Sequence, residues 1–343
     1  MALPRTLSKP IRARIENVVF QSAIIALVLN YLPRLSEYIP YGFSRQALSA
    51  IPLARKLLKI LWGFAIVKNL SGIASHVALN SWKTNEWNDE QEIVVVTGGS
   101  SGIGALVVRG FAERGAKVAI LDLQEPKESL GPNISFYKCD VTSSSEISKV
   151  ATEVRSKFGD PTVLINNAGI GFAETILGGT EAHLRATMNV NLLSHFLMVK
   201  EYLPSMVKRN KGHVVTVASM ASVVTIASNV DYSCTKAGVL AFHEGLRQEL
   251  DYRYNARLVR TSIIHPTWVR TPLTAPMGGH SDELTKGILE PEVIADAIVS
   301  QVVSGYGGQI FCPPNLSLMS GIRGFPHWLQ ESIRGAQKNV LQL

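Results

Sequence analysis

Residues 92–104 read EIVVVTGGSSGIG, an apolar run rich in β-branched residues followed by a glycine-rich segment. A continuous run of this kind is typical of a parallel strand that is buried on both faces. The apolar pattern of residues 105–114 then predicts a helix directly after the glycines. Residues 92–114 therefore predict a strand, a tight turn and a helix, which is the repeating unit of α/β sheets.

The same alternation continues along the chain. Further strands are predicted at 117–123, 134–139, 162–166, 214–218, 260–265 and 309–311, and further helices at 144–158, 180–208, 231–254 and 291–304. Strands that alternate with helices in this way form a doubly wound parallel sheet. We therefore expect an α/β fold of the Rossmann type over residues 86–312, with an apolar helical extension at 1–85 and a C-terminal tail or flap at 313–343.

The glycine spacing of the first turn indicates a nucleotide site. A glycine-rich turn between a strand and a helix lets the backbone approach a pyrophosphate at the helix N-terminus. An ordinary tight turn is the alternative, and the acid at the end of the next strand, Asp122, argues against it. The candidate cofactor-binding residues of the turn, in a Gly-x-x-x-Gly-x-Gly pattern, are Gly98, Ser100, Ser101, Gly102, Ile103 and Gly104.

The end of the predicted strand 117–123 indicates which cofactor binds. A carboxylate there, Asp122, accepts hydrogen bonds from the adenosine ribose and repels the 2′-phosphate of NADP. Neither Arg nor Lys lies in the glycine turn to offset this charge. We therefore expect NAD rather than NADP. Asp140, which ends the third strand, is either a contact for the adenine amino group or an ordinary turn aspartate.

A second group of residues has the composition of a proton-transfer site for an alcohol and its carbonyl. Tyr232 and Lys236 are four residues apart, so a helix places both on one face. Tyrosine has a reference pKa near ~10, and an ammonium beside it lowers that value towards the range used in acid–base catalysis. Ser219 supplies a hydroxyl that can hold a substrate oxygen. On its own, a tyrosine four residues before a lysine would also be expected on a solvent-exposed helix face. The cofactor motif elsewhere in the chain favours the catalytic interpretation.

In combination these motifs resemble those of the short-chain dehydrogenase/reductase superfamily. The resemblance extends over residues 92–311 and includes two further segments, NNAG at 166–169 and MNVNL at 188–192. It implies a catalytic tetrad of Asn191, Ser219, Tyr232 and Lys236. It also implies that the cofactor is contacted by Asn167, Ala168, Gly169, Val269 and Thr271, as well as by Tyr232 and Lys236.

The resemblance also implies a role for each member of the tetrad. Tyr232 would exchange a proton with the substrate oxygen, and Ser219 would orient that oxygen. Lys236 would bind the nicotinamide ribose and lower the tyrosine pKa, while Asn191 would kink its helix and hold a water that connects Lys236 to solvent. The chain departs from the family at Thr267, where glycine is usual, because threonine cannot adopt backbone angles reserved for glycine.

The basic residues are concentrated near the N-terminus. Residues 1–80 carry ten Lys and Arg against two acidic residues, a net charge of +8, whereas the whole chain has +7. This distribution argues against a nucleic-acid-binding face on the α/β domain. Two apolar runs, 18–32 and 57–79, lie among the basic residues. The first is shorter than the ~20 residues that span a bilayer, and the second is interrupted by charge, so neither is a clean membrane span.

We nevertheless expect residues 1–85 to form a membrane anchor or a monotopic segment, with basic side chains at the headgroups. A pair of amphipathic helices packed on the α/β domain or on a partner is the alternative. With these N-terminal segments the chain resembles the membrane- and lipid-droplet-associated branch of the family, which acts on retinol, steroids or other lipid alcohols. This resemblance implies the endoplasmic reticulum or a lipid droplet as the location, with the catalytic domain facing the cytosol. Three widely spaced cysteines, with no spacing typical of disulfides or zinc, fit a reducing compartment.

The segments expected around the substrate are apolar. The loop at 268–288 contributes Trp268, Leu273, Met277, Leu284 and Ile288, with Phe172, residues 223–226 and the tail at 312–328 expected nearby. An apolar pocket favours a lipophilic substrate, such as a retinoid or a steroid, although these residues would also suit a core. The hypothesis is an NAD-dependent dehydrogenase of lipid alcohols, and the family resemblance implies a homodimer through helices 180–208 and 231–254. The alternatives are an NADPH-dependent carbonyl reductase and a non-catalytic lipid-binding scaffold.

Overall fold

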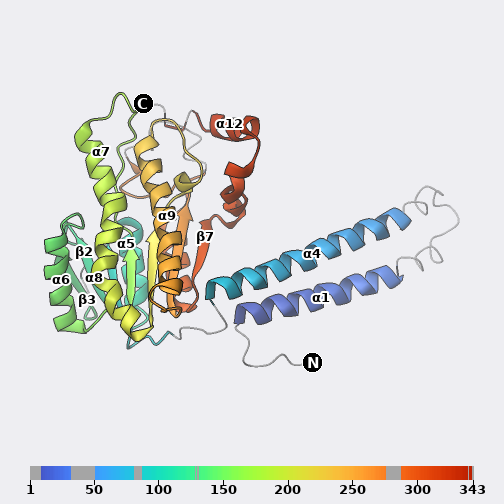
Figure 1. Ribbon diagram of the computed structural model, residues 1–343, viewed down its shortest axis with the longest axis horizontal. Coiled ribbons are helices and arrows are strands. Elements are labelled where there is room, and N and C mark those ends of the chain that lie inside the picture. The colour runs from blue at the N-terminus through green and yellow to red at the C-terminus, as the bar shows by residue number, and fades with distance from the viewer. Residues whose placement is uncertain are drawn as a thin grey trace. The chain divides into compact units, whose positions relative to one another are not determined.

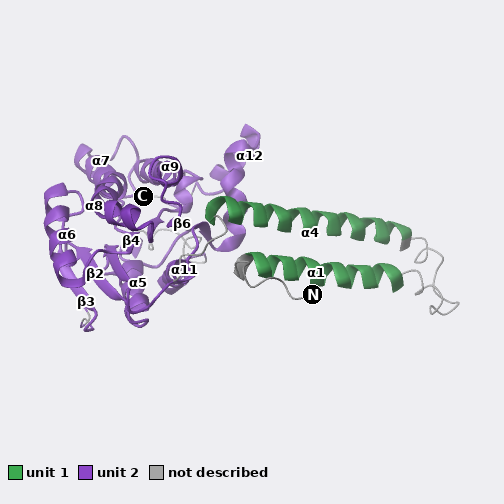
Figure 2. Ribbon diagram, turned by 60° about the horizontal axis from the view of Figure 1, so that its bottom comes forward, with its two compact units in different colours: residues 1–84 green, residues 85–343 purple. Residues whose placement is uncertain are grey.

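The computed structural model describes residues 9–31, 51–80, 87–127, 129, 131–275, 287–338 and 340–341. The chain divides into two compact units, residues 1–84 and residues 85–343 (Figure 2). Each unit has its own secondary structure and is described by itself below.

The larger unit is built on a seven-stranded sheet in which all neighbouring strands are parallel. The strands are β1 (Ile93–Thr97), β2 (Lys117–Asp122), β3 (Ile134–Lys138), β4 (Val163–Asn166), β5 (Gly212–Val217), β6 (Val259–Pro266) and β7 (Gly308–Cys312). Their order across the sheet is β3-β2-β1-β4-β5-β6-β7. The order therefore reverses between β1 and β4, and a crevice forms at the carboxyl ends of the strands at such a point.

Helices cover both faces of the sheet (Figure 1). On one face, α5 (Gly102–Ala112) and α11 (Pro291–Val303) share an apolar core with the strands. On the other face, α6 (Ser144–Phe158), α8 (Ser194–Arg209) and α9 (Val230–Tyr252) do the same. The central strands are buried on both faces, which explains their continuous apolar sequences. The α/β fold predicted from the sequence is thus confirmed.

Two regions differ from the helices expected from the sequence. The single helix expected over 180–208 consists of α7 (Glu181–Met188), a π-helical turn η1 (Asn189–Leu193) and α8. The C-terminal region, which was expected to be a tail or a flap, forms a 3₁₀ segment η4 (Pro314–Gly324) and the helix α12 (His327–Gly335). A short 3₁₀ turn η2 (Met220–Ser222) also follows β5.

The smaller unit contains two long helices, α1 (Lys9–Tyr31) and α4 (Ile51–Asn80), which lie side by side and run in opposite directions (Figure 1). Trp62 Nε1 on α4 donates a hydrogen bond of 3.0 Å to Ser22 Oγ on α1. Further along the pair, the side chain of Arg14 fills the space that a Cβ at Gly72 would occupy. Polar contacts and a glycine therefore hold the two helices close together.

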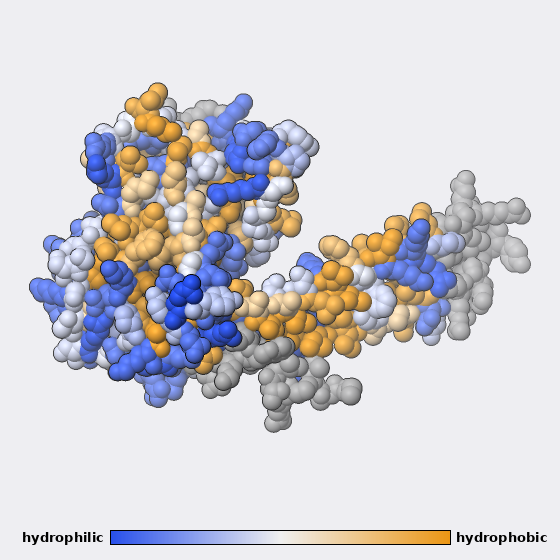
Figure 3. All heavy atoms as spheres, viewed as in Figure 1, coloured by the Kyte–Doolittle hydropathy of each residue, from blue (hydrophilic) through white to orange (hydrophobic). Residues whose placement is uncertain are grey.

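Both helices are longer than the apolar runs of the sequence. The structure extends the helix at 18–32 backwards to Lys9, and the candidate spans are Ile11–Tyr31, 21 residues, and Pro52–Asn80, 29 residues, both of which still contain charged side chains. By length and composition alone, both are able to cross a membrane. Large apolar side chains are exposed along the pair (Figure 3), including Phe20, Leu27, Leu61, Phe64 and Val67.

Two glycine substitutions test the close packing at the start of β5. Gly212 has a φ of +155°, and a Cβ there would lie 2.7 Å from two side-chain atoms of Met206. We expect Gly212→Ala to lower the free energy of unfolding by about 1–3 kcal/mol, because the added methyl group overpacks this contact.

Gly245 in α9 is the matched control, since no described atom lies within 4 Å of its Cβ position. Gly245→Ala should raise the free energy of unfolding by about 0.4–1 kcal/mol. Urea denaturation followed by circular dichroism measures both variants. A Gly212→Ala protein as stable as the wild type would contradict the crowding inferred at this position.

Candidate active site

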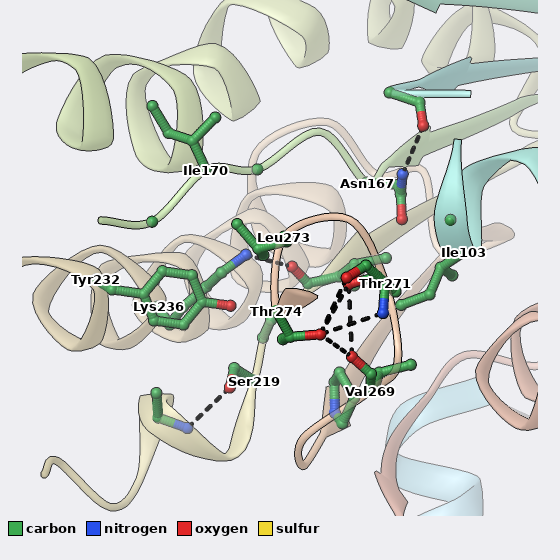
Figure 4. A pocket seen from close by; sticks show the side chains of 18 of the residues that line it. Ile103, Asn167, Ile170, Ser219, Tyr232, Lys236, Val269, Thr271, Leu273 and Thr274 are labelled. Atoms are coloured by element: carbon green, nitrogen blue, oxygen red, sulfur yellow. Dashed lines mark hydrogen bonds between the residues drawn. The ribbon is translucent and has the colours of Figure 1, made fainter. Parts of the chain in front are cut away.

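A cavity of about 640 Å³ opens at the carboxyl ends of the strands, where the strand order reverses. Most of the residues expected at the site line it (Figure 4): Gly98, Ser101, Gly102, Ile103, Asp122, Asp140, Asn167, Ala168, Gly169, Ser219, Tyr232, Lys236, Val269 and Thr271. The other three, Ser100, Gly104 and Asn191, are not among the lining residues and lie behind the cavity wall. The structure thus gathers segments that are far apart in the sequence around one space.

The glycine turn has the backbone geometry that a bound phosphate needs. Gly98 has a φ of +64°, and a Cβ on it would lie 2.9 Å from the Cα of Ala168. A Cβ on Gly104 would overlap the carbonyl oxygen of Gly98, so the start of α5 packs directly on the turn. Larger residues at these two positions would separate α5 from the ends of β1 and β4.

The N-terminus of α5 meets the cavity at Gly102. Ser101 is the N-cap but makes no side-chain capping bond, and the first turn contains no acidic residue. Unpaired backbone N–H groups and the helix dipole favour an anion at such an end. Together with the glycine geometry, this end of the cavity fits the pyrophosphate of a dinucleotide.

Asn167 connects the glycine turn to the end of β4. Its Nδ2 donates to the carbonyl oxygens of Thr97 and Gly98, at 3.1 Å each. The hydroxyl of Thr97 accepts hydrogen bonds from the backbone N–H groups of Asn167 and Ala168, at 3.0 and 3.1 Å. These four bonds hold the ends of β1 and β4 in one arrangement. Two of the residues that make them, Asn167 and Ala168, belong to the NNAG segment at 166–169.

The two aspartates of the site have different surroundings. Asp122 accepts hydrogen bonds from the backbone N–H groups of Ser100 (3.1 Å) and Gln124 (3.2 Å), so its carboxylate is held beside the glycine turn. Asp140 Oδ1 accepts from the backbone N–H and the hydroxyl of Thr142, at 2.8 and 2.7 Å. These contacts are those of an ordinary turn aspartate. Asp140 also lines the cavity, as a contact for the adenine amino group would.

Ser219, Tyr232 and Lys236 meet on the other side of the cavity. Figure 4 shows the hydroxyl groups of Tyr232 and Ser219 directed into the same part of it. Ser219 Oγ accepts a hydrogen bond of 3.1 Å from the backbone N–H of Ala221, which leaves its own proton available to an oxygen in the cavity. Lys236 Nζ lies 5.4 Å from the centre of the Tyr232 ring and donates to the carbonyl oxygen of Val217 at 2.9 Å.

The pKa of Tyr232 differs from the expectation. Burial raises the pKa of Tyr232 to about 12, and the neighbouring Ser219 hydroxyl opposes this rise only in part. Burial lowers the pKa of Lys236 to about 8. The expected lowering of the tyrosine pKa is thus absent from this arrangement, because removing the phenol from water disfavours the phenolate and the ammonium bonds Val217 instead.

Asn191 lies in the π-helical turn η1 and is fully buried. Its Oδ1 accepts from the backbone N–H of Ile170, and its Nδ2 donates to the carbonyl oxygen of the same residue, both at 2.8 Å. A Cβ on Gly169 would lie 3.5 Å from Asn191 Oδ1 and 3.8 Å from Lys236 Nζ. Asn191 therefore fixes the loop after β4 and lies next to the lysine, separated from the cavity by Gly169.

The threonine that replaces the usual glycine of the family is accommodated without strain. The described non-glycine residues with positive φ are Ala173, Asn210, Ser228 and Asn255, so Thr267 has an ordinary backbone conformation. Its N–H donates to the carbonyl oxygen of Cys312 on β7 at 2.9 Å. Beyond it, Thr274 Oγ1 donates to the carbonyl oxygen of Val269 and accepts from the N–H of Thr271, which orders the next turn (Figure 4).

The part of the cavity beyond the hydroxyl groups is mostly apolar. It is lined by Val224, Ile226, Trp268, Leu273, Leu316, Met319, Ile333 and Gln337. Trp268, Leu273 and the tail up to residue 328 were expected near the substrate from the sequence. Ile333 in α12 and Gln337 just after it were not expected there. Ile288 packs beside Trp268 in a small apolar cluster. The Phe172 ring stacks on the imidazole of His183, with 3.9 Å between the ring centroids. Met277 and Leu284 lie outside the described residues.

Known proteins are similar to this chain in sequence and in fold. Residues 92–281 match the family described as short chain dehydrogenase. Dehydrogenase RED2 of Cochliobolus heterostrophus is 43% identical over 247 residues, which cover 70% of this chain and 92% of that protein. The 17-beta-hydroxysteroid dehydrogenase 13 of Mus musculus is 30% identical over 238 residues, 66% of this chain and 76% of that protein.

A solved structure of serine dehydrogenase in its closed form, complexed with NADP⁺, has a TM-score of 0.58 and 26% identity, and the alignment covers 64% of this chain and 93% of that one. The family match extends over more than half of the chain and contains strands β1 to β6 and most of the residues that line the cavity. The resemblance inferred from the sequence is thereby confirmed: the protein belongs to the short-chain dehydrogenases, a family of oxidoreductases, and its relatives include 17-beta-hydroxysteroid dehydrogenases.

Proposed function

We propose that the protein transfers a hydride between NAD and a lipophilic alcohol or its carbonyl. The observation that carries this proposal is the continuity of the cavity, which extends from the glycine turn past Ser219 and Tyr232 to an apolar end. A dinucleotide at the glycine turn and a substrate at the apolar end would meet beside the two hydroxyl groups. Apolar walls with a few polar groups at one point are typical of sites for lipophilic small molecules.

In the proposed mechanism the nicotinamide, when bound, supplies or accepts the hydride. The chain's own residues handle the proton. Tyr232 exchanges a proton with the substrate oxygen, and Ser219 donates a hydrogen bond to that oxygen as charge develops on it. Burial lowers the pKa of Lys236 to about 8, and its Nζ is held by the carbonyl oxygen of Val217 beside the Tyr232 ring, where the lysine would bind the cofactor ribose.

The role of Tyr232 is tested by removing its hydroxyl. Tyr232→Phe should lower kcat by roughly 10²- to 10⁴-fold, because the proton donor is lost, while the Kd for NAD changes less than twofold. Tyr202→Phe is the matched control, since the buried hydroxyl of Tyr202 has no hydrogen-bond partner among the described residues. Absorbance of NADH and isothermal titration with NAD measure the two quantities. Full turnover by Tyr232→Phe would refute the mechanism.

The preference for NAD is attributed to Asp122. Its carboxylate is held beside the glycine turn, where the adenosine ribose would lie, and repels a 2′-phosphate. Asp122→Ser should lower kcat/KM for NAD by roughly 10- to 100-fold, through the loss of charge-assisted hydrogen bonds, and raise that for NADP. Steady-state kinetics with both cofactors give the ratio. A wild-type enzyme that prefers NADP would contradict this role and favour the carbonyl reductase.

We further propose that the protein acts at a membrane surface. Three observations support this proposal. Two helices are able to cross a membrane, and the cavity is mostly apolar. Large apolar side chains are also exposed on the segments that line the cavity. Ile176 and Leu177 lie in the connection from β4 to α7 and are 76% and 99% exposed, and Leu318 and Trp328 lie in the C-terminal segments, 77% and 70% exposed. Both connections also contribute residues to the cavity wall. Amphiphilic aromatic and apolar side chains of this kind insert at the headgroup boundary.

The rim residues are tested in the full chain with a long-chain alcohol dissolved in phosphatidylcholine vesicles. Leu177→Ser with Trp328→Ser should raise the apparent KM for the vesicle-borne alcohol about tenfold or more, since less apolar surface enters the bilayer. The KM for a short, water-soluble alcohol should stay unchanged. Val293→Ser, an exposed apolar site on α11, is the control. An unchanged KM for the vesicle-borne alcohol would leave the rim without a membrane role.

A homodimer through α7, α8 and α9 is proposed on similar grounds. Leu184, Leu193 and Phe196 lie along the α7–α8 segment and are each 46% exposed. Exposed apolar side chains gathered on one pair of helices are typical of an interface between copies.

A further inference from the structure

The backbone carbonyl of Ser219 is held by three donors. It accepts from the N–H of Ser222 at 3.0 Å and from the hydroxyl of Ser222 at 2.6 Å, and His265 Nδ1 lies 3.2 Å away. Ser222 and His265 are both fully buried. Together these three donors fix the position of the Ser219 backbone at the start of the turn η2, and so of the hydroxyl that faces the substrate.

The hydrogen bonds around His265 form a chain with one direction. Gln309 Nε2 lies 2.9 Å from His265 Nε2; an amide N–H only donates, so this imidazole nitrogen accepts. The proton of His265 is therefore on Nδ1, which is 2.8 Å from Ser222 Oγ. Ser222 in turn donates to the carbonyl oxygen of Ser219. The other tautomer would place a lone pair of Nδ1 against that carbonyl oxygen, so both ends of the chain require the same tautomer.

The surroundings of His265 keep it neutral and immobile. Its ring stacks on Phe311 of β7 with a centroid distance of 4.6 Å and an interplanar angle of 13°. The pKa of His265 is lowered to about 4, chiefly by burial and to a lesser extent by the charge of Lys236, while the hydrogen bond with the Ser219 carbonyl opposes this shift. The other titratable group that faces it is His243, whose pKa burial lowers to about 4. At neutral pH His265 therefore acts as a fixed donor and not as a proton carrier.

We propose that His265 is a positioning residue for the reaction, which holds Ser219 so that its hydroxyl meets the substrate oxygen. The proposal rests on the function proposed above, in which Ser219 orients that oxygen. Gln309 selects the tautomer, and Ser222 transmits the contact to the Ser219 backbone. Arg323 of the C-terminal segment donates to the carbonyl oxygen of Ser222 at 3.2 Å, so the segment that closes the apolar end of the cavity also holds this turn.

The test compares His265→Leu with His265→Asn. Leucine fills the space without a donor, whereas the amide N–H of asparagine can replace Nδ1–H. We expect His265→Leu to lower kcat about tenfold, the equivalent of one lost hydrogen bond, with the Kd for NAD unchanged. His265→Asn should recover most of this loss. Because the Ser219 hydroxyl lowers the pKa of Tyr232, its displacement should also shift the pH profile of alcohol oxidation to higher pH.

His213→Leu is the matched control for a merely structural role. His213 is also buried in the sheet and makes a bond of 2.8 Å to Ser262, and neither of these two residues lines the cavity. Both leucine variants should lower the thermal midpoint, and only His265→Leu should shift the pH profile. Equal losses of kcat in the two variants, with no shift of the profile, would overturn the proposal.

A crystal structure of full-length His265→Leu gives a readout that is independent of activity. We expect the carbonyl and hydroxyl oxygens of Ser219 to move or to occupy a second conformation. An unchanged Ser219 would overturn the positioning role even if the enzyme turned over normally. Conversely, a wild-type protein without alcohol turnover, or a fully active Ser219→Ala, would refute the proposed function, while the crystal structure still decides whether His265 holds the turn.

Discussion

The side chain of Asn167 makes the interaction on which the rest of the site depends. It bonds the carbonyl oxygens of Thr97 and Gly98 and so joins the ends of β1 and β4, the two strands between which the order of the sheet reverses. Parallel strands that diverge from such a point leave a crevice at their carboxyl ends. Glycine at 98 and 104 lets α5 approach the turn closely at this crevice, because a Cβ at either position would clash with backbone atoms. Backbone geometry at one edge of the sheet thus creates the space in which the side chains act.

Burial controls the chemistry available in that space. Removing Tyr232 from water raises its pKa, and removing Lys236 from water lowers its pKa, so the two values move apart. A hydroxyl at Ser219 opposes the rise for the tyrosine. A displacement of Ser219 would remove this opposition and leave the tyrosine a weaker acid. Neutral donors behind the turn suit this arrangement, since a second charge would disturb both values.

The two units of the chain share an unusual exposure of apolar surface. In the smaller unit the exposed side chains run along α1 and α4, and in the larger unit they lie on connections that also line the cavity. Water alone disfavours such surfaces, because burying apolar area is worth roughly 25 cal/mol per Å². A lipid phase would satisfy both sets, and a substrate that dissolves in the same phase would explain why the cavity is apolar at its far end.

The sequence by itself determined the strand–glycine–helix unit, the acid at the end of β2 and the spacing of Tyr232 and Lys236. Each depends on a local period or on neighbours in one element, which the order of residues expresses directly. Only the tertiary structure decided the contacts of Asn191 with Ile170, of His265 with Ser219 and of α12 with the cavity. These contacts join residues far apart in the chain, and they arise from how strands and helices stack. The pKa of Tyr232 belongs to the same group, because it depends on exclusion of water by the whole fold.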